Sequence, residues 1–295
     1  MPQQLDRWAH WLLSGRDGGD PEVLARRLPF LYDVRDRILD NASIEPGAVV
    51  LDLGTGNGLI AFGAVDRVGV TGRVIFSDVS DDLLAECRRI AEEAGVASQC
   101  EFVRASASEL DPIGDDTVDV ATTRSVLIYL DDKRPAFREM FRVLKPGGRI
   151  SLFEPINRFG WPEPNDLFLG FDARFVQHLA AKVKATYGPP DEHPLTNFDE
   201  RDLFRFAEDA GFREVVLDYR AELTAWPLDT RDWDTLMQMS GNPLDPPIGE
   251  SIRQALTPAE REEFEAFLRP LVESGQPRVG RSARVFLRAA KPIND

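Results

Sequence analysis

Cysteine is scarce in this sequence, and long apolar runs are missing from it. Cys87 and Cys100 are the only 2 cysteines among 295 residues, too few for a disulfide scaffold or a zinc cluster. No stretch approaches the roughly 18 apolar residues of a membrane-spanning helix. The N-terminal stretch MPQQLDRWAHWLLSG lacks the basic region and apolar core of a signal peptide. These features predict a cytoplasmic protein with no membrane partner.

Positive charge is also in short supply. The chain has 35 Lys and Arg against 50 Asp and Glu, a formal net charge of −15. A surface this acidic repels a phosphate backbone, so no nucleic-acid partner is expected. No cluster of cysteines or carboxylates suggests a metal site, and no metal is expected. Apolar residues make up 43% of the chain, which is enough for a full core.

Short apolar strands alternate with helical patterns through the first half of the chain. Strands are predicted at 48–54, 73–79, 100–105, 118–123 and 149–155, followed later by 212–223 and 282–290. Helices are predicted at 81–94, 132–144 and 199–210, with a tight turn at 145–148. This alternation predicts βαβ crossovers, and so an α/β, doubly wound sheet with helices on both faces.

Three stretches fall outside the alternation. The predicted organisation is a helical cap at 1–45, core at 46–155, an insertion at 156–195, core again at 196–221, a helical insertion at 222–280, and the last strand and tail at 281–295. Asp20 and Pro21 begin a helix in the first stretch, and Pro29 should kink or split it. The insertions are rich in aromatic residues and proline, and follow strands at one edge of the sheet. We therefore expect these three stretches to form a lid over a site at that edge.

The sharpest motif is VLDLGTGNG, residues 50–58, where an apolar strand ends in a glycine-rich turn before a helix. Glycines let the backbone approach a ligand closely, and the helix start offers free N–H groups. Asp78 ends the next strand, where a carboxylate can accept hydrogen bonds from ribose hydroxyls. A dinucleotide-binding site fits this pattern loosely. Asp52 favours a cationic ligand instead, because a carboxylate at the strand tip would repel a pyrophosphate.

The motif resembles the first motif of class I S-adenosylmethionine-dependent methyltransferases. The stretch FREMFRVLKPGG, residues 137–148, resembles the small-molecule methyltransferases of the ubiquinone and menaquinone type. The resemblance covers about half of the chain. It implies a seven-stranded, mostly parallel Rossmann-like sheet, S-adenosyl-L-methionine as cofactor, and methyl transfer to a small-molecule substrate.

The resemblance also assigns site residues. Those expected at the cofactor are Asp52, Gly54, Thr55, Gly56, Asp78, Val79, Ser106, Ala107 and Arg124. Ser106 stands where the family usually has an aspartate near the adenine amine, and a hydroxyl accepts that bond more weakly. Arg124 follows the fourth strand, where the family lines both the cofactor and the substrate mouth.

Catalysis needs little from the protein, because the sulfonium already activates the methyl group. A base is required only if the acceptor loses a proton, and His178 or His193 in the aromatic insertion are the candidates. Glu154, Trp161 and Phe171 are expected to contact the substrate, a small, apolar or aromatic metabolite. Two alternatives stay open: a protein of this fold that binds the cofactor without methyl transfer, and an NAD-dependent oxidoreductase. The oligomeric state and the acceptor atom are not predicted.

Overall fold

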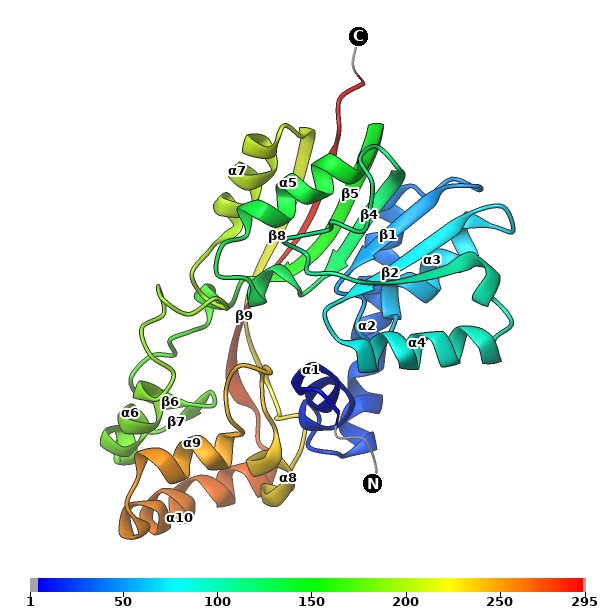
Figure 1. The fold of residues 1–295 in the computed structure, drawn as a ribbon. Helices are drawn as coiled ribbons and strands as arrows, with labels where there is room; N and C mark the ends of the chain where they lie inside the picture. The colour runs from blue at the N-terminus through cyan, green and yellow to red at the C-terminus, as the bar shows by residue number, and fades with distance from the viewer. Residues whose placement is uncertain (1–4, 294–295) are drawn as a thin grey trace.

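The computed structural model describes residues 5–293, so the ends of the cap and tail at 1–4 and 294–295 lie outside the described residues. Its centre is a seven-stranded sheet of order β3-β2-β1-β4-β5-β9-β8 (Figure 1). The strands are β1 Val49–Leu53, β2 Arg73–Asp78, β3 Cys100–Arg104, β4 Val118–Arg124, β5 Leu144–Pro155, β8 Arg213–Trp226 and β9 Arg278–Ala290. Only β9 runs antiparallel to its neighbours. The predicted seven-stranded, mostly parallel Rossmann-like fold is confirmed.

Helices cover both faces of this sheet. They are α2 Pro21–Ala42, α3 Leu59–Val68 and α4 Asp81–Glu93 on one face, and α5 Arg134–Val143 and α7 Glu200–Ala210 on the other. Successive strand residues supply the two cores in turn. In β1, Val50 packs with the first set of helices, whereas Leu51 and Leu53 pack with the second.

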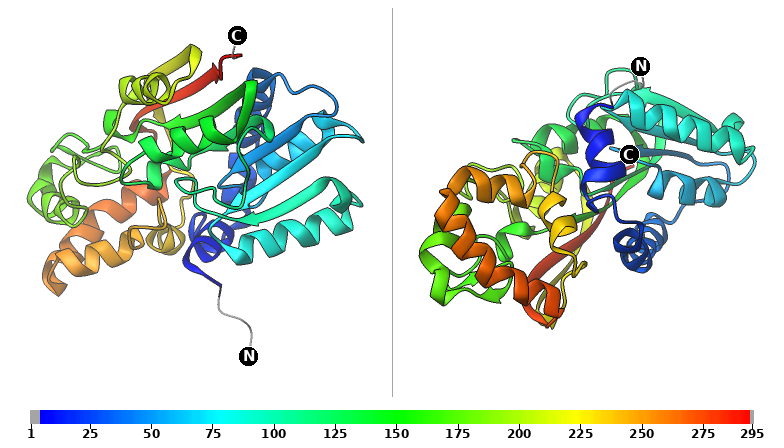
Figure 2. Two further views of the ribbon diagram at one scale, coloured as in Figure 1. Left: turned by 45° about the horizontal axis from the view of Figure 1, so that its top comes forward. Right: turned by 90° about the horizontal axis from the view of Figure 1, so that it is seen from below.

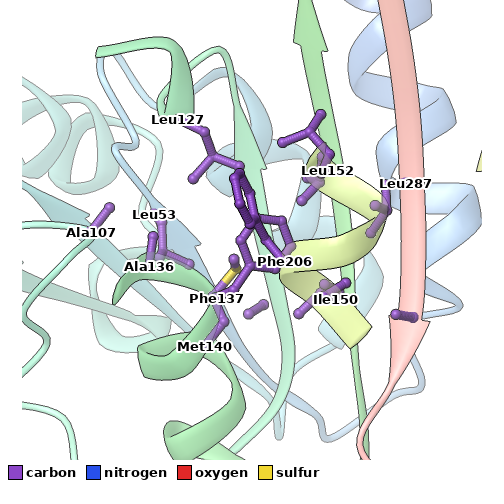
Figure 3. Packing of buried hydrophobic residues seen from close by; sticks show 14 of the residues in the cluster. Leu53, Ala107, Leu127, Ala136, Phe137, Met140, Ile150, Leu152, Phe206 and Leu287 are labelled. Atoms are coloured by element: carbon purple, nitrogen blue, oxygen red, sulfur yellow. The ribbon is translucent and has the colours of Figure 1, made fainter. Parts of the chain in front are cut away.

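The core beneath α5 and α7 is the larger of the two. Figure 3 shows Phe137 and Met140 of α5 and Phe206 of α7 meeting strand residues such as Ile150. Phe137, Met140 and Ile150 are fully buried. Close packing of this kind holds the strands in place, so the loops at their carboxyl ends start from fixed positions.

The lid is a small unit with a core of its own. It contains the hairpin strands β6 Leu167–Phe168 and β7 Phe171–Asp172 and the helices α6 Gln177–Ala185, α8 Trp233–Gln238, α9 Ile248–Ala255 and α10 Pro258–Ser274. The long strands β8 and β9 connect the lid to the sheet. They stay paired out to Trp226 and Arg278, whereas β5 ends opposite Arg284. A two-stranded ribbon therefore projects beyond the carboxyl edge of the sheet into the lid (Figure 1).

Helix α2 joins the two units, and of the two predicted effects of Pro29 the split does not occur. Val23 near its start belongs to the lid core, whereas Val34 and Ile38 belong to the sheet core. The helix continues from Pro21 to Ala42 with Pro29 inside, so Pro29 does not split it. Packing at both ends holds the helix together across the missing hydrogen bond.

The predicted tight turn at 145–148 is wrong in detail. These residues belong to β5, and the register of β4 and β5 shifts between Val118 and Val120. Gly147 and Gly148 also form backbone hydrogen bonds with Lys291, the N–H of Gly147 donating at 2.9 Å. This pairing with the residue just after β9 draws the stretch into the sheet as a bulge.

The N-terminal helix α1, Arg7–His10, lies between the lid and the sheet domain (Figure 2). A π-helical segment, Trp11–Gly15, follows it directly. Among the described residues, no helix combines the length and the apolar character needed to cross a membrane.

Candidate functional site

A cavity of about 510 Å³ opens at the carboxyl edge of the sheet. The lid and the N-terminal segment, which we define as residues 5–20, enclose it. Every residue that sequence analysis assigned to the cofactor lines it: Asp52, Gly54, Thr55, Gly56, Asp78, Val79, Ser106, Ala107 and Arg124. These residues come from the ends of β1, β2 and β4 and from the loop after β3. They converge because parallel strands end at one edge of the sheet.

The glycine loop after β1 is held in a conformation that favours glycine. Gly54 and Gly56 have φ of 60° and 57°. A Cβ on Gly54 would lie 2.4 Å from a Val126 methyl carbon, and one on Gly56 would lie 3.0 Å from Leu12. Between them, the buried hydroxyl Oγ1 of Thr55 has no hydrogen-bond partner among the described residues. The loop therefore lines the cavity closely and keeps one buried hydroxyl without a partner.

Asp78 is fixed as an acceptor at the floor of the cavity. Its Oδ2 accepts the Gly56 N–H at 2.8 Å, and its Oδ1 accepts the Ser80 N–H at 2.9 Å. Ser80, not Asp78, caps α4, since the Ser80 hydroxyl accepts the Leu83 N–H. Each carboxylate oxygen keeps a lone pair for a ligand hydroxyl. Burial raises the pKa of Asp78 above its ordinary value.

Asp52 lies deeper, at the tip of β1. It is 1% exposed and accepts the Thr122 hydroxyl at 2.8 Å. Burial raises its pKa to about 7, against the lowering effect of the hydrogen bond from the Thr122 hydroxyl. A cationic ligand group beside Asp52 would restore its charge.

The N-terminal segment closes one side of the cavity through contacts that the sequence does not reveal. Asp6 caps α1, its N–H donates to Asp82 at 2.7 Å, and its Oδ2 accepts the Ser80 hydroxyl at 2.6 Å. Trp8 meets the Tyr129 ring edge-on, with centroids 5.2 Å apart. Trp8, Trp11, Leu12, Arg16 and Tyr129 all line the cavity.

The same segment is bonded to the lid. The indole Nε1 of Trp11 donates to the Ser240 carbonyl at 3.0 Å, and the Ser240 N–H donates to the Gly15 carbonyl at 3.2 Å. On α2, Arg27 binds Asp229 of the lid with two nitrogens, at 3.0 and 2.6 Å. These contacts hold the N-terminal segment and α2 against the lid beside the cavity.

A second cavity of about 460 Å³ adjoins the first under the lid. The two share lining residues, namely Pro155, Asn157, Leu169, Leu195, Gly241 and Ile248. Trp161 and His193 line the second cavity. The His193 Nε2 lies 3.3 Å from Asp245 Oδ1, which orients the ring.

Three predicted residues lie elsewhere. Phe171 is 4% exposed and packs in the lid core, because the β6–β7 hairpin turns it inward. His178 lies on the exposed side of α6 and lines neither cavity. Glu154 is fully buried behind the cavity wall, where it accepts the N–H groups of Val126 and Leu127 at 2.9 and 3.0 Å. Glu154 supports the loop after β4, and burial raises its pKa to about 7.

The donor set fits S-adenosylmethionine. A glycine loop that allows close approach, an acid with free acceptor sites at the end of β2 and a buried acid at the tip of β1 meet the needs of a ribose and a cationic amino-acid group. In the part of the chain that the structure describes, no group of three or more His, Cys, Asp and Glu is placed to hold a metal ion.

Comparison with known proteins gives a consistent result. A model of the ubiE/COQ5 methyltransferase family matches residues 32–221. The ubiquinone/menaquinone biosynthesis C-methyltransferase UbiE of Klebsiella pneumoniae subsp. pneumoniae is 34% identical over 183 residues, which cover 60% of this chain and 71% of that protein. The UbiE protein of Cronobacter sakazakii is 33% identical over 184 residues, with the same two shares of 60% and 71%.

Solved structures share the fold. The YcgJ protein of Bacillus subtilis matches with a TM-score of 0.54 at 20% identity, over 89% of this chain and 99% of that one. A geranyl diphosphate methyltransferase in complex with S-adenosylmethionine matches with a TM-score of 0.53 at 17% identity, over 94% and 92% of the two chains.

Proposed function

Because the chain belongs to the ubiE/COQ5 methyltransferase family and is an S-adenosylmethionine-dependent methyltransferase, we propose that its acceptor is a small, largely apolar or aromatic molecule bound between the glycine loop and the lid. Family membership decides against the NAD-dependent oxidoreductase that the glycine pattern left open. The main support for the proposal is that all predicted cofactor residues line one cavity, which the lid encloses.

The cofactor is proposed to lie along the carboxyl edge of β1 and β2. Asp78 would accept hydrogen bonds from the ribose hydroxyls, since both of its oxygens are already aimed by backbone N–H groups. The loop around Gly54 and Gly56 and the side chain of Asp52 would receive the methionine end. Ser106 and Ala107 would border the adenine.

The acceptor is proposed to occupy the lid side of the cavity. Aromatic and aliphatic side chains from the N-terminal segment, the loop after β4 and the lid form that side: Trp8, Trp11, Leu12, Tyr129, Leu228, Leu236 and Met239. Apolar walls favour an apolar acceptor and exclude water from the reacting atoms. The adjoining cavity beside Trp161 gives a longer acceptor room to extend.

Bound S-adenosylmethionine supplies a methyl group on a sulfonium, and the chain has to position an acceptor atom in line with it. Positioning falls to the N-terminal segment and the lid, which are bonded to each other through Trp11 and Ser240. For an acceptor that loses a proton, His193 is the proposed base, because it lines the second cavity and Asp245 orients it. His178 is not proposed, because it lines neither cavity.

Product formation tests this proposal. The protein is incubated with S-adenosylmethionine and a low-molecular-weight metabolite extract, and S-adenosylhomocysteine and methylated products are followed by mass spectrometry. We expect extract-dependent S-adenosylhomocysteine and an apolar or aromatic product 14 mass units heavier, about the mass of one CH₂. A methylated product that is strongly polar and non-aromatic would contradict the proposed acceptor class.

A further inference from the structure

Arginine side chains gather around the cavity of a strongly acidic protein. Arg16, Arg27, Arg124 and Arg278 all line it, although the whole chain carries a net charge of −15. They come from the N-terminal segment, α2, the end of β4 and the start of β9. Three regions far apart in the sequence, namely residues 16–27, the end of β4 and the start of β9, thus bring positive charge to one place.

One of these arginines is fully matched by acids. Arg27 binds Asp17 at 2.6 Å through one nitrogen and Asp229 through two others. Its charge therefore serves to join α2 to the lid. It contributes little net attraction for a ligand.

Arg16 and Arg124 have acids near them but lack such hydrogen bonds. The Nε of Arg16 lies 3.7 Å from Asp17 Oδ1, close enough for an ion pair but beyond hydrogen-bond reach, and it is buried without a hydrogen-bond partner. No hydrogen bond from the Arg124 side chain to another described residue is present. Burial lowers the pKa of Arg124 below its ordinary value, and repulsion by the positive charge of Arg16 adds to this effect. Two guanidinium groups that line the same cavity and keep free donors form a site for an anion.

S-adenosylmethionine brings no net negative charge to this cavity, because its one carboxylate is outweighed by an ammonium and a sulfonium. Asp52 and Asp78 lie on the proposed cofactor side of the cavity, and Asp17 and Asp229 are bonded to Arg27. None of these acids accepts a hydrogen bond from the side chain of Arg16 or Arg124, so the donors of both are available to a further anionic group.

We propose that the methyl acceptor carries an anionic oxygen group, of carboxylate or phosphate type, that Arg16 and Arg124 bind. This inference rests on the proposed function and narrows its substrate class to apolar or aromatic acids. A planar guanidinium offers paired N–H donors that match two oxygens of such a group, and a buried charged hydrogen bond of this kind is strong. The apolar walls around Trp8, Trp11 and Tyr129 would hold the remainder of the molecule.

The test uses small oxyanions on the protein saturated with S-adenosylhomocysteine. Acetate, benzoate, phosphate and phenyl phosphate are compared at equal ionic strength with chloride, and benzamide serves as the uncharged match for benzoate. We expect benzoate or phenyl phosphate to raise the melting temperature where chloride and benzamide do not. If none of the four oxyanions stabilises the protein beyond chloride, the inference is wrong.

Variants locate the anion. Arg16→Gln and Arg124→Gln should each weaken binding of the stabilising anion about tenfold or more, as expected for a lost charged hydrogen bond. The control Arg201→Gln removes an equal charge from a side chain that is 88% exposed on α7, and it should leave anion binding unchanged. Equal weakening by all three variants would mean that anion binding depends only on the overall charge of the protein, and it would overturn the inference.

A last comparison separates the acceptor from the cofactor's own carboxylate. The affinities of the variants for S-adenosylhomocysteine and for methylthioadenosine, which lacks the amino-acid part, are measured by calorimetry. We expect both to stay within about threefold of the unmodified protein, a change of under 1 kcal/mol, because the inference moves Arg124 from the cofactor, where the resemblance places it, to the acceptor. If S-adenosylhomocysteine binding falls tenfold while methylthioadenosine binding holds, the arginines bind the cofactor, and the inference fails. If S-adenosylhomocysteine does not bind the unmodified protein, the proposed function itself fails.

Discussion

The Oδ2 of Asp78 accepts the backbone N–H of Gly56 at 2.8 Å, so the acid that ends β2 is bonded directly to the glycine loop that follows β1. The two halves of the proposed cofactor site are therefore set relative to each other before any ligand arrives. A site organised in this way loses little conformational entropy on binding.

Replacement of Asp78 should weaken the cofactor specifically. In Asp78→Asn one oxygen becomes an N–H donor, which cannot accept from a ribose hydroxyl or from the loop. Loss of a charged acceptor costs about 1.5–3 kcal/mol, or about 10- to 150-fold in affinity. Calorimetry with S-adenosylhomocysteine measures this, with Asp81→Asn as control, because the Asp81 side chain is 70% exposed. Unchanged affinity in Asp78→Asn would show that Asp78 does not bind the ribose.

Two buried acids predict how stability varies with pH. Burial raises the pKa of Glu154 and of Asp52 to about 7. The folded protein then holds these protons more tightly than the unfolded chain, whose acids have ordinary values of 4.5 and 3.8. Their contribution to stability is therefore complete below the ordinary values and is lost as the pH rises through about 7.

Urea unfolding at pH 5 and pH 8 measures this dependence. We expect the free energy of unfolding to be lower at pH 8 than at pH 5. The decrease should be smaller in Glu154→Gln, whose amide does not titrate. The amide oxygen can still accept the N–H groups of Val126 and Leu127. An equal fall in the variant would show that Glu154 keeps its charge throughout this range.

The bond between the N-terminal segment and the lid should govern closure. Trp11→Phe removes the indole N–H that donates to Ser240 but keeps an aromatic ring. The loss of one such bond costs about 1 kcal/mol, so local opening should become about fivefold more frequent. Hydrogen exchange of residues 8–16 and 236–242 measures it. Trp226→Phe on the ribbon is the control, and equally fast exchange in both variants would contradict the closure role.

Two aromatic residues of the first insertion should behave differently. Phe171→Ala opens a hole in the lid core and should cost about 3–5 kcal/mol of unfolding free energy. Trp161→Ala, at the wall of the second cavity, should cost much less and leave cofactor affinity unchanged. Denaturant unfolding and calorimetry test the pair. A similar loss of stability in both would make Trp161 a structural residue.

The same pair shows where sequence patterns stop being informative. The glycine loop and Asp78 follow from local rules, since a turn after a strand and an acid at the next strand tip are neighbours in any parallel sheet. Phe171 and Trp161 lie in an irregular insertion without a period of 2 or 3.6, so nothing in the pattern indicates which side is buried. The contact of Trp11 with Ser240 joins residues 229 positions apart, and only the folded chain brings them together.

Arg16 and Tyr129 were missed for a similar reason. Each sits in a short segment whose sequence reads as an ordinary helix end or loop, and each becomes a cavity residue only when the N-terminal segment packs on the loop after β4. Their signal in the sequence is weak. Two tryptophans close together near the N-terminus, Trp8 and Trp11, are the feature that points to a role in packing.

The most direct test of the account is the melting temperature of the protein with S-adenosylhomocysteine, S-adenosylmethionine or NAD. A ligand that binds only the folded state adds RT ln(1 + [L]/Kd), about 2.7 kcal/mol at a hundredfold excess over Kd. We predict a clear rise with either of the first two ligands and none with NAD. A rise with NAD alone would contradict the cofactor site described around Asp78 and Gly56.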